Sequence, residues 1–313
     1  MNSPAPLVSV ILLTYNHEKY IEESIESILL QKCNFSFELI IGEDCSTDNT
    51  RELVLGYQNK YPDLISCITP ECNVGEALNE LRCLKYASGK YVAYLEGDDF
   101  WTDPYKLQKQ VDFLENNPDY GLVHGDVNHL NQATGKTIFA YNKTNKINIP
   151  EGSIFNELMV PSHLIKTMTV CLRKEIFDRY YLNNTRIMYS EWRLIDLSIW
   201  LMFSLHTKIK YFNEVLATYR LLPESMSRTK DFQKLYSFHK KIYDIRFFFM
   251  KQKSVPSQLR LRIYNEYYNF LFFDGYNLHN KRMMYRGVKG LRSFDQSIKI
   301  KQLAMMLNRC ILI

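Results

Sequence analysis

Three acidic side chains directly follow a short apolar run. Residues 91–95 (YVAYL) precede Glu96, Asp98 and Asp99. Carboxylates crowded beside a buried strand repel one another and lose hydration, so such a cluster indicates a site for a hard cation that accompanies phosphate. The cluster therefore predicts a bound Mg²⁺ or Mn²⁺ ion. The alternative is a solvated acidic turn, because Gly-Asp-Asp is also good turn chemistry.

Two further polar clusters follow apolar runs earlier in the chain. Residues 7–13 and 37–41 are typical of buried strands. The polar residues after these runs are Thr14, Tyr15, Asn16, Glu43 and Asp44. Strand and helix patterns alternate four times in about 95 residues, which predicts an α/β fold with a parallel sheet and helices on both faces. Ligands of such sheets bind beyond the carboxyl ends of the strands, so the three clusters are expected to converge.

Local signals mark the helices and the later strands. Asn16 is a suitable N-cap for the helix that follows the first strand. Short strands are predicted at 120–124, 167–172 and 215–219. From residue 231 onward the pattern is almost wholly helical, with Pro256 separating two long segments.

Charge is unevenly distributed along the chain. The net charge is +5, but residues 228–313 hold 18 Lys and Arg against five acids, together with 16 of the 43 aromatic residues. Such a tail suits an anionic membrane surface, a nucleic acid, or a helical core with basic outer faces, and the last is the interpretation we favour. No nucleic-acid recognition motif accompanies the charge, so nucleic acid is not expected as a partner.

The apolar segments and the cysteines of the sequence indicate the cellular compartment. No apolar run reaches the ~18–20 residues that span a bilayer, and the first residues lack a charged-then-apolar signal pattern. The seven cysteines include no Cys-x-x-Cys pair and are odd in number, which argues against a zinc ribbon and a disulfide framework. We expect reduced thiols and a cytoplasmic protein.

Four segments together resemble a known family. Residues 8–16, 41–50, 73–75 and 87–99 are similar, in order and spacing, to the nucleotide-sugar-binding half of family 2 glycosyltransferases. The resemblance covers residues 7–128 well and 165–228 more loosely. It implies a GT-A fold over 1–228, with a nucleotide-sugar-binding half (1–128) and an acceptor-binding half (129–228). Residues 229–313 form a separate helical, basic and aromatic region.

The resemblance also assigns roles by position in the first half. Thr14, Tyr15 and Asn16 stand where the family lines the nucleobase, and the Tyr15 ring is available for stacking. Asp44 stands where the family reads the base edge. Glu96, Asp98 and Asp99 match its Asp-x-Asp-Asp site for metal and ribose, with Asp98 and Asp99 as the metal ligands. Glu43 and Glu96 each replace an Asp that is usual in the family.

The second half of the resemblance supplies a candidate base. Residues 191–201 are similar to the family segment in which an Asp precedes Trp-Leu on a helix, which places the general base at Asp196, with Glu191 as the alternative. A sugar hydroxyl is a poor nucleophile, so a carboxylate must take its proton as the anomeric bond forms. A surface acid on an amphipathic helix is the structural alternative for Asp196.

Two basic residues are candidates for the diphosphate. Arg220 lies in residues 219–227, which resemble the segment that closes over the diphosphate, and an Arg there can bind phosphate. The family's usual His in that segment would align with Leu222. The Arg that the family carries in the helix before the fourth strand is displaced here, and Arg82 is the nearest substitute.

The resemblance implies an inverting, metal-dependent transfer from a nucleoside-diphosphate sugar, most plausibly a UDP-sugar, to a glycan or lipid-linked acceptor. The chain has no Gln-x-x-Arg-Trp sequence, the mark of processive members, so it is expected to add single sugars. Contact of residues 229–313 with the inner face of the membrane, or with a second copy of the chain, is a further hypothesis beside the favoured helical core. A non-catalytic nucleotide-sugar or glycan-binding module on the same fold is the alternative function.

Overall fold

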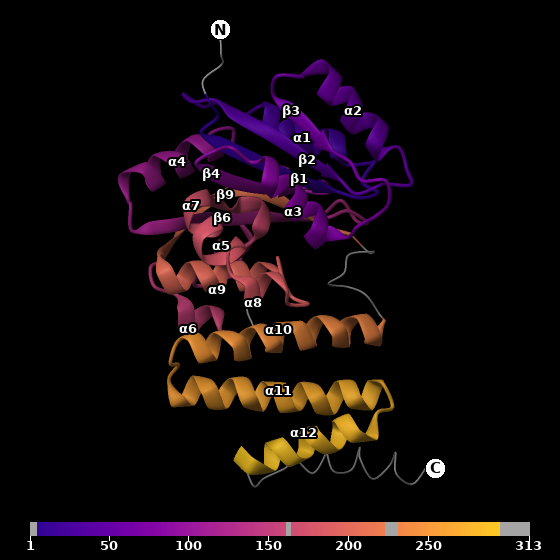
Figure 1. Cartoon of the computed structure of the whole chain (residues 1–313), viewed down its shortest axis with the longest axis vertical. Coiled ribbons are helices and arrows are strands. Elements are labelled where there is room, and N and C mark those ends of the chain that lie inside the picture. Colours follow the sequence, from indigo (N-terminus) through magenta and orange to yellow (C-terminus); the bar gives the residue numbers. More distant parts are fainter. Residues whose placement is uncertain (1–4, 161–163, 223–230, 295–313) are drawn as a thin grey trace. The chain divides into compact units, whose positions relative to one another are not determined.

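The computed structural model describes residues 5–160, 164–222 and 231–294. The chain divides into two compact units. The first comprises residues 1–158 and 162–223, and the second comprises residues 224–313 together with 159–161. Figure 1 shows the sheet with its helices in the first unit and long stacked helices in the second.

Four apolar runs form the parallel half of the sheet. They are β1 (Val8–Thr14), β2 (Phe37–Glu43), β3 (Ile65–Ile68) and β4 (Tyr91–Glu96). Their order is β3-β2-β1-β4, and each neighbouring pair is parallel. Strands of this kind are covered on both faces, which explains why nearly every residue of β1 and β4 is buried. The predicted parallel sheet is thereby confirmed.

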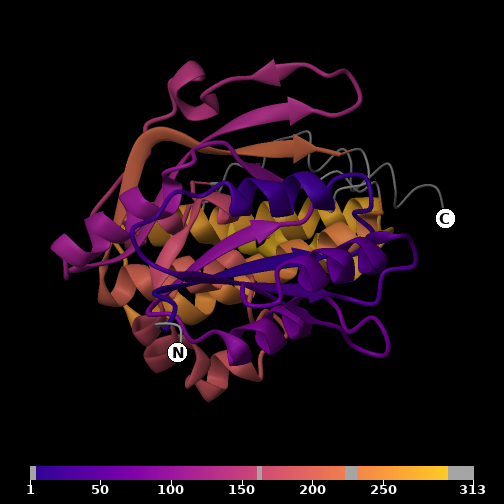
Figure 2. The same ribbon diagram turned by 90° about the horizontal axis from the view of Figure 1, so that it is seen from above.

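Five later strands extend the sheet and make it mixed. They are β5 (Phe100–Trp101), β6 (Tyr120–Asn131), β7 (Thr137–Ile138), β8 (Cys171–Arg173) and β9 (Lys208–Leu221). β8 lies antiparallel between β4 and β6, and β6 and β9 run side by side in parallel (Figure 2). The predicted strand at 167–172 is wrong in its first half, which is the 3₁₀ turn η1 (Thr167–Thr169). The backbone N–H of Thr169 closes that turn by donating to the carbonyl of Lys166 over 2.9 Å.

Helices pack against the sheet. Those of the first half are α1 (Ile21–Leu29), α2 (Thr50–Lys60), α3 (Glu76–Tyr86) and α4 (Lys106–Asn116). The prediction that Asn16 caps α1 is wrong, because Tyr20 precedes the first helical residue and gives no side-chain cap. Asn16 instead has a left-handed backbone (φ 57°) and accepts a hydrogen bond from the Thr47 N–H over 2.8 Å.

The second half adds short helices and one buried helix. The short ones are α5 (Tyr141–Thr144), α6 (Phe155–Leu158), α7 (Lys174–Phe177), η2 (Asp178–Leu182) and α8 (Thr185–Met188). The buried one is α9 (Asp196–His206), in which Ile199, Trp200 and Leu201 are almost inaccessible to solvent. A helix that is apolar all round belongs in a core, so Asp196 stands at the point where this core helix begins.

Three helices make up the described part of the second unit. They are α10 (Phe232–Gln252), α11 (Ser257–Asn277) and α12 (Lys281–Phe294). α10 and α11 meet through aromatic rings, as in Phe247 against Tyr267, with centroids 5.0 Å apart. α12 packs on α11, where Phe272, Met284 and Val288 form a small core. Much of the aromatic content of residues 231–294 is therefore helix packing, in line with the favoured interpretation. Within the described ranges, no helix has the length and apolar character needed to cross a bilayer.

Candidate active site

The polar clusters predicted to converge lie at one edge of the sheet. Thr14 is in register with Glu43 across β1 and β2, and Leu13 is in register with Glu96 across β1 and β4. Parallel strands end on the same side, so the residues after each strand are neighbours. The sheet therefore brings the three predicted clusters together.

The acidic turn after β4 is held by α1. The Ser24 hydroxyl lies 2.9 Å from the carbonyl oxygen of Gly97 and 2.5 Å from that of Asp99, so it ties both ends of the turn to the helix. A Cβ on Gly97 would lie 2.6 Å from the Thr14 hydroxyl oxygen, so only glycine fits there. Asp99 is buried, and its Oδ1 accepts the backbone N–H of Arg220 over 2.7 Å. The turn is a fixed element, tied to both halves of the sheet.

Asp98 differs from Asp99 in its surroundings. Its side chain is half-buried and makes no hydrogen bond within the described part of the chain. It faces His17, whose pKa it raises, although burial lowers that pKa more strongly. Asp98 is thus a carboxylate at the site whose oxygens are uncommitted.

Asp196 joins this group from the other half of the first unit. It is open to solvent, and one of its carboxylate oxygens accepts a hydrogen bond from the Thr167 hydroxyl. Although the residue keeps an exposed surface, the protein packed around its carboxylate displaces water and raises the pKa of Asp196, whereas the hydrogen bond from Thr167 and the charge of Lys166 lower it. A carboxylate that is accessible, oriented and raised in pKa has the properties of a general base.

A small cavity connects Asp196 to further acids. Its lining comprises Leu13, Glu76, Glu80, Tyr94, Leu95, Glu96, Thr167, Asp196, Ile199 and Trp200. Oε2 of Glu96 is inaccessible to solvent and has no hydrogen-bond partner in the described ranges. The Tyr94 hydroxyl lies next to the carboxylate of Glu80 and interacts with it. Burial is the main cause that raises the pKa of Glu80 and Glu96 well above the usual value, and repulsion from Asp196 adds to it. The acids of the two halves therefore act on one another electrostatically.

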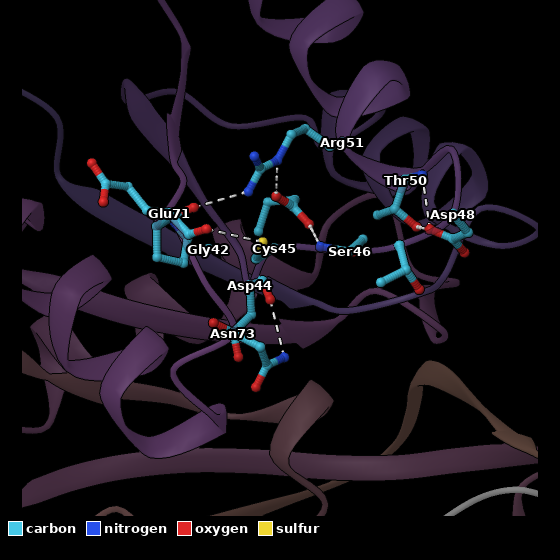
Figure 3. Close-up of polar contacts among 12 residues, drawn as sticks. Gly42, Asp44, Cys45, Ser46, Asp48, Thr50, Arg51, Glu71 and Asn73 are labelled. Carbon is cyan, nitrogen blue, oxygen red and sulfur yellow. Dashed lines mark hydrogen bonds and ion pairs between the residues drawn. The ribbon is translucent and has the colours of Figure 1, made fainter.

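Asp44 holds two loops together. Its carboxylate accepts the backbone N–H groups of Val74 (2.9 Å) and Gly75 (2.8 Å), and its carbonyl accepts Nδ2 of Asn73 over 3.0 Å. Figure 3 shows the Asn73 contact, and next to it the Cys45 thiol at 3.5 Å from the carbonyl oxygen of Glu71. Asp44 is buried in this arrangement. Asp44 lies at the strand ends, as expected. Its role in reading the edge of the nucleobase stays a prediction.

Glu43, one of the two replacements for a family Asp, is fully buried. Its Oε1 accepts the backbone N–H of Ser46 over 2.6 Å, and its Oε2 accepts Nε of Arg51 over 2.6 Å. Arg51 also donates to the Pro70 carbonyl over 3.1 Å. The longer side chain of Glu43 thus links the loop after β2 to α2 and to the loop after β3, so its oxygens are committed.

The predicted nucleobase residues lie along the loop after β1. Thr14 is buried, with its hydroxyl oxygen 3.2 Å from Nδ1 of His17. Tyr15 is 42% exposed, which leaves its ring free to stack. The Asn16 N–H donates to the Ser46 hydroxyl over 3.0 Å. Only Tyr15 of these three presents a large uncommitted surface.

Arg220 is placed away from solvent and has protein partners. It forms an ion pair with Glu23, and its Nη1 donates to Oε1 of Gln132 over 2.9 Å. Its guanidinium carbon lies 5.0 Å and 4.9 Å from the ring centroids of Tyr20 and Phe100. The side chain is only 5% exposed, so it braces β9 against α1. The rest of its predicted segment, residues 223–227, lies outside the described residues.

The remaining predicted residues are less closely tied to the acids. Arg82 is half-buried on α3, and its Nη1 has no hydrogen-bond partner within residues 5–160, 164–222 and 231–294. No ion pair joins it to an acid in those ranges. Glu191, the alternative base, is exposed before α9 and does not line the cavity.

The donor set at the acidic turn is compatible with a divalent ion. No group of three His, Cys, Asp or Glu side chains in the described ranges is arranged to hold a metal by itself. Magnesium-type ions in phosphate sites, however, commonly take one or two carboxylates and complete their shell with phosphate oxygens and water. Asp98, with its uncommitted oxygens, and Asp99 provide such a pair, and the mutual repulsion of the nearby acids favours a cation.

Sequence reasoning missed four residues of this site. Glu76 and Glu80 stand four residues apart on one face of α3, and Lys166 and Thr167 precede β8. The spacing of the two glutamates was the available signal, but the same spacing is usual on a solvated helix face. Nothing local distinguishes Lys166 and Thr167.

The profile described as Glycosyl transferase family 2 matches residues 9–180. Rv1520, an uncharacterized protein of Mycobacterium tuberculosis, is 40% identical over 112 residues, which are 36% of this chain and 32% of Rv1520. The chain thus spans about a third of the length of this relative.

Two relatives match over most of their length. TuaG of Bacillus subtilis, described as a candidate glycosyltransferase of teichuronic acid biosynthesis, is 32% identical over 74% of this chain and 85% of its own. WfgD of Escherichia coli, a UDP-Glc:alpha-D-GlcNAc-diphosphoundecaprenol beta-1,3-glucosyltransferase, is 30% identical over 72% of this chain and 81% of its own.

Solved structures show the same fold. TarS of S. aureus, residues 1–349 with UDP-GlcNAc, has a TM-score of 0.61 at 20% identity, covering 95% of this chain and 83% of that one. The mannosyltransferase PcManGT of Pyrobaculum calidifontis, with GDP-Man and Mn²⁺, has a TM-score of 0.60 at 15% identity, covering 98% and 80%. The predicted GT-A-like α/β fold with a helical C-terminal region is therefore confirmed. With the profile covering more than half of its residues, this chain belongs to glycosyl transferase family 2.

Proposed function

We propose that the chain is an inverting, metal-dependent, non-processive glycosyltransferase. Its donor is a nucleoside-diphosphate sugar, for which we expect a UDP-sugar, and its acceptor is a hydroxyl of a glycan or lipid-linked glycan. The observation that carries this proposal is that Asp196 and Glu96, a hundred residues apart in sequence, line one cavity, with Glu96 at the end of β4 where the acidic turn begins. WfgD, TarS and PcManGT support the substrate class through the donors and acceptor in their names.

The residues divide the chemistry between them. A hydroxyl oxygen of the acceptor attacks the anomeric carbon from the face opposite the diphosphate, and Asp196 takes the hydroxyl proton, so the configuration inverts. Asp98 and Asp99 would hold the divalent ion, which when bound neutralises charge on the departing diphosphate. Tyr15 supplies a ring on which the nucleobase stacks.

A donor panel tests this proposal. The full chain is given UDP-, GDP- and dTDP-sugars with Mn²⁺ and undecaprenol-diphosphate-linked sugar acceptors, and nucleotide release and binding are measured. Asp196→Asn should lower turnover at least about 100-fold with nucleotide affinity nearly unchanged, and Asp98→Asn should weaken the Mn²⁺-dependent part of binding. Asp119→Asn, at an exposed ion pair with Lys208, is the matched control. A fully active Asp196→Asn variant would refute the assignment of the base, and tight binding without any turnover would favour the non-catalytic module.

The exposed face of α12 supports a membrane-facing location on the cytoplasmic side. Its apolar residues pack on α11, which leaves Lys281, Arg282, Arg286, Lys289 and Arg292 exposed with no acid in the helix. Anionic lipid attracts such clusters by about 1 kcal/mol per basic residue near the surface. In a flotation experiment, the chain should be found with anionic vesicles at low salt and should dissociate from them at high salt. Equal recovery with neutral vesicles would contradict an electrostatic attraction to anionic lipid, and formation of a dimer in place of flotation would contradict membrane binding.

A further inference from the structure

Lys166 stands between the two acidic elements of the site. It precedes η1, a turn that is held on several sides. The Trp101 Nε1–H donates to the Met168 carbonyl over 2.8 Å, and Nε2 of Gln110 donates to the Thr169 carbonyl over 2.7 Å. The neighbouring Thr167 hydroxyl is bound to Asp196. The backbone that carries Lys166 is therefore fixed relative to the sheet and to Asp196.

Among the residues that the structure describes, the ammonium group of Lys166 has no counter-ion. It is half-buried, its Nζ lies 5.5 Å from the centroid of the Tyr219 ring, and it forms no ion pair or hydrogen bond in the described ranges. Asp99 and Asp196 both raise its pKa, but burial lowers it more. The lysine is close enough to feel acids from both elements and too far from either to pair. A partly buried ammonium in that position is costly unless an anion completes its surroundings.

Two other cations near the strand ends, both in the described part of the chain, are engaged by protein partners. Arg220 is paired with Glu23 and enclosed by two rings. Arg51 is paired with Glu43. Lys166, by contrast, is a cation on which both Asp99 and Asp196 act, and its Nζ makes no hydrogen bond within the described ranges. Its three N–H donors are suited to the oxygens of a phosphate.

We propose that Lys166 binds the β-phosphate of the nucleoside diphosphate and stabilises it as the leaving group. This inference rests on the proposed glycosyl transfer. As the bond between the anomeric carbon and the β-phosphate oxygen breaks, its electron pair passes to that oxygen, where Lys166 meets the new charge. The acceptor oxygen forms the new bond to the anomeric carbon and its proton goes to Asp196, so charge and atoms balance. Lys166 thereby takes the place that the sequence resemblance gives to Arg220.

Comparing a nucleoside diphosphate with its nucleoside isolates this contact. The wild-type chain is first titrated calorimetrically with UDP, GDP and dTDP, with and without Mn²⁺, to identify the diphosphate that binds. The nucleoside of that diphosphate is then titrated in parallel. Lys166→Gln should weaken binding of the diphosphate at least about tenfold, because a hydrogen bond to a charged group is lost. It should leave the affinity for the nucleoside unchanged. Lys166→Arg should retain most of the affinity, and Lys210→Gln, at the surface ion pair with Glu151, should match wild type.

The outcomes separate this inference from the proposal beneath it. Equal weakening of diphosphate and nucleoside, or no weakening of either, overturns the role of Lys166 while the glycosyltransferase proposal stands. Failure of the wild-type chain to bind any of the three diphosphates overturns both. Thermal unfolding of each variant shows whether it is folded, and Lys166→Arg tests the charge even where Lys166→Gln proves unstable.

Discussion

The Thr167 hydroxyl donates a hydrogen bond to a carboxylate oxygen of Asp196. This contact joins the turn before β8 to the first residue of α9, so the candidate base is oriented by a neighbour from another element. Hydrogen bonding to the charged form of a carboxyl favours that form. Thr167 therefore influences both where Asp196 points and at which pH it is able to accept a proton.

Thr167→Val should shift the pH dependence of transfer. Burial raises the pKa of Asp196 and the Thr167 hydrogen bond lowers it, so removal of the hydroxyl raises that pKa further. A base must be deprotonated, and the acid limb of kcat/KM against pH should move to higher pH. Thr167→Ser keeps the hydroxyl and should keep the wild-type limb. An unmoved limb in Thr167→Val would show that Asp196 is not the titrating base.

The sequence was sufficient for the parallel half of the sheet. Continuous apolar runs such as residues 91–95 have few other stable environments, and polar residues after each run must meet where parallel strands end. Thr14 and Glu96 were found in this way because register and strand direction follow from local pattern. The family resemblance then located Asp196.

The remainder of the site depends on contacts distant in sequence. Lys166 reaches the acids only because β8 inserts antiparallel between β4 and β6, an arrangement that no local periodicity encodes. In the sequence, Glu80 resembles a solvent-facing residue of a helix. Only the packing of α3 against the sheet shows that it is buried. Arg220 looks free until its partners Glu23 and Gln132 are known.

Glu80→Gln should make stability less sensitive to pH. Burial, then repulsion from Asp196 and Glu76, raises the folded-state pKa of Glu80 well above the usual value. A carboxyl with a raised pKa stabilises the fold when protonated, below its unfolded pKa, and loses that contribution as pH rises through the folded pKa. The variant should therefore match wild type at low pH and exceed its Tm increasingly towards pH 8. Glu52→Gln, at an exposed site on α2, should show no such trend. A variant that is less stable at pH 8 would mean that Glu80 is held charged.

Lys106→Met should stabilise the first unit, and more so at lower pH. Lys106 is fully buried over the Trp101 ring at 4.1 Å, and burial lowers its pKa from 10.5 to about 7. The stability associated with a lowered pKa is present above 10.5 and is lost as pH falls towards 7. The gain at pH 6 should exceed that at pH 9 by on the order of 3 kcal/mol.

Two lost contacts oppose this gain, of which the longer is a 3.5 Å hydrogen bond from Nζ of Lys106 to the Val170 carbonyl. Nζ of Lys106 donates to Oε1 of Gln110 over 2.9 Å, and leaving that oxygen unpaired costs roughly 1–3 kcal/mol. The net effect at pH 9 should therefore be close to zero. Urea unfolding at both pH values measures the difference. Lys109→Met is the control on the same helix, where the lysine is half-buried and paired with Asp103 and Glu214. A gain independent of pH would show that Lys106 is not neutralised in the fold.

Gly287→Ala should separate α12 from α11. A Cβ at Gly287 would lie 2.7 Å from the backbone nitrogen of Phe272 and 2.7 Å from the backbone oxygen of Tyr268, and backbone atoms of a helix cannot move aside individually. Overpacking of this kind costs about 1–3 kcal/mol. Hydrogen exchange of the α12 amides should therefore accelerate. Gly56→Ala is the matched control, because a Cβ there meets nothing within 4 Å and the helix gains roughly 0.5–1 kcal/mol. If exchange in α12 were the same in both variants, the close approach of α11 and α12 at Gly287 would be disproved.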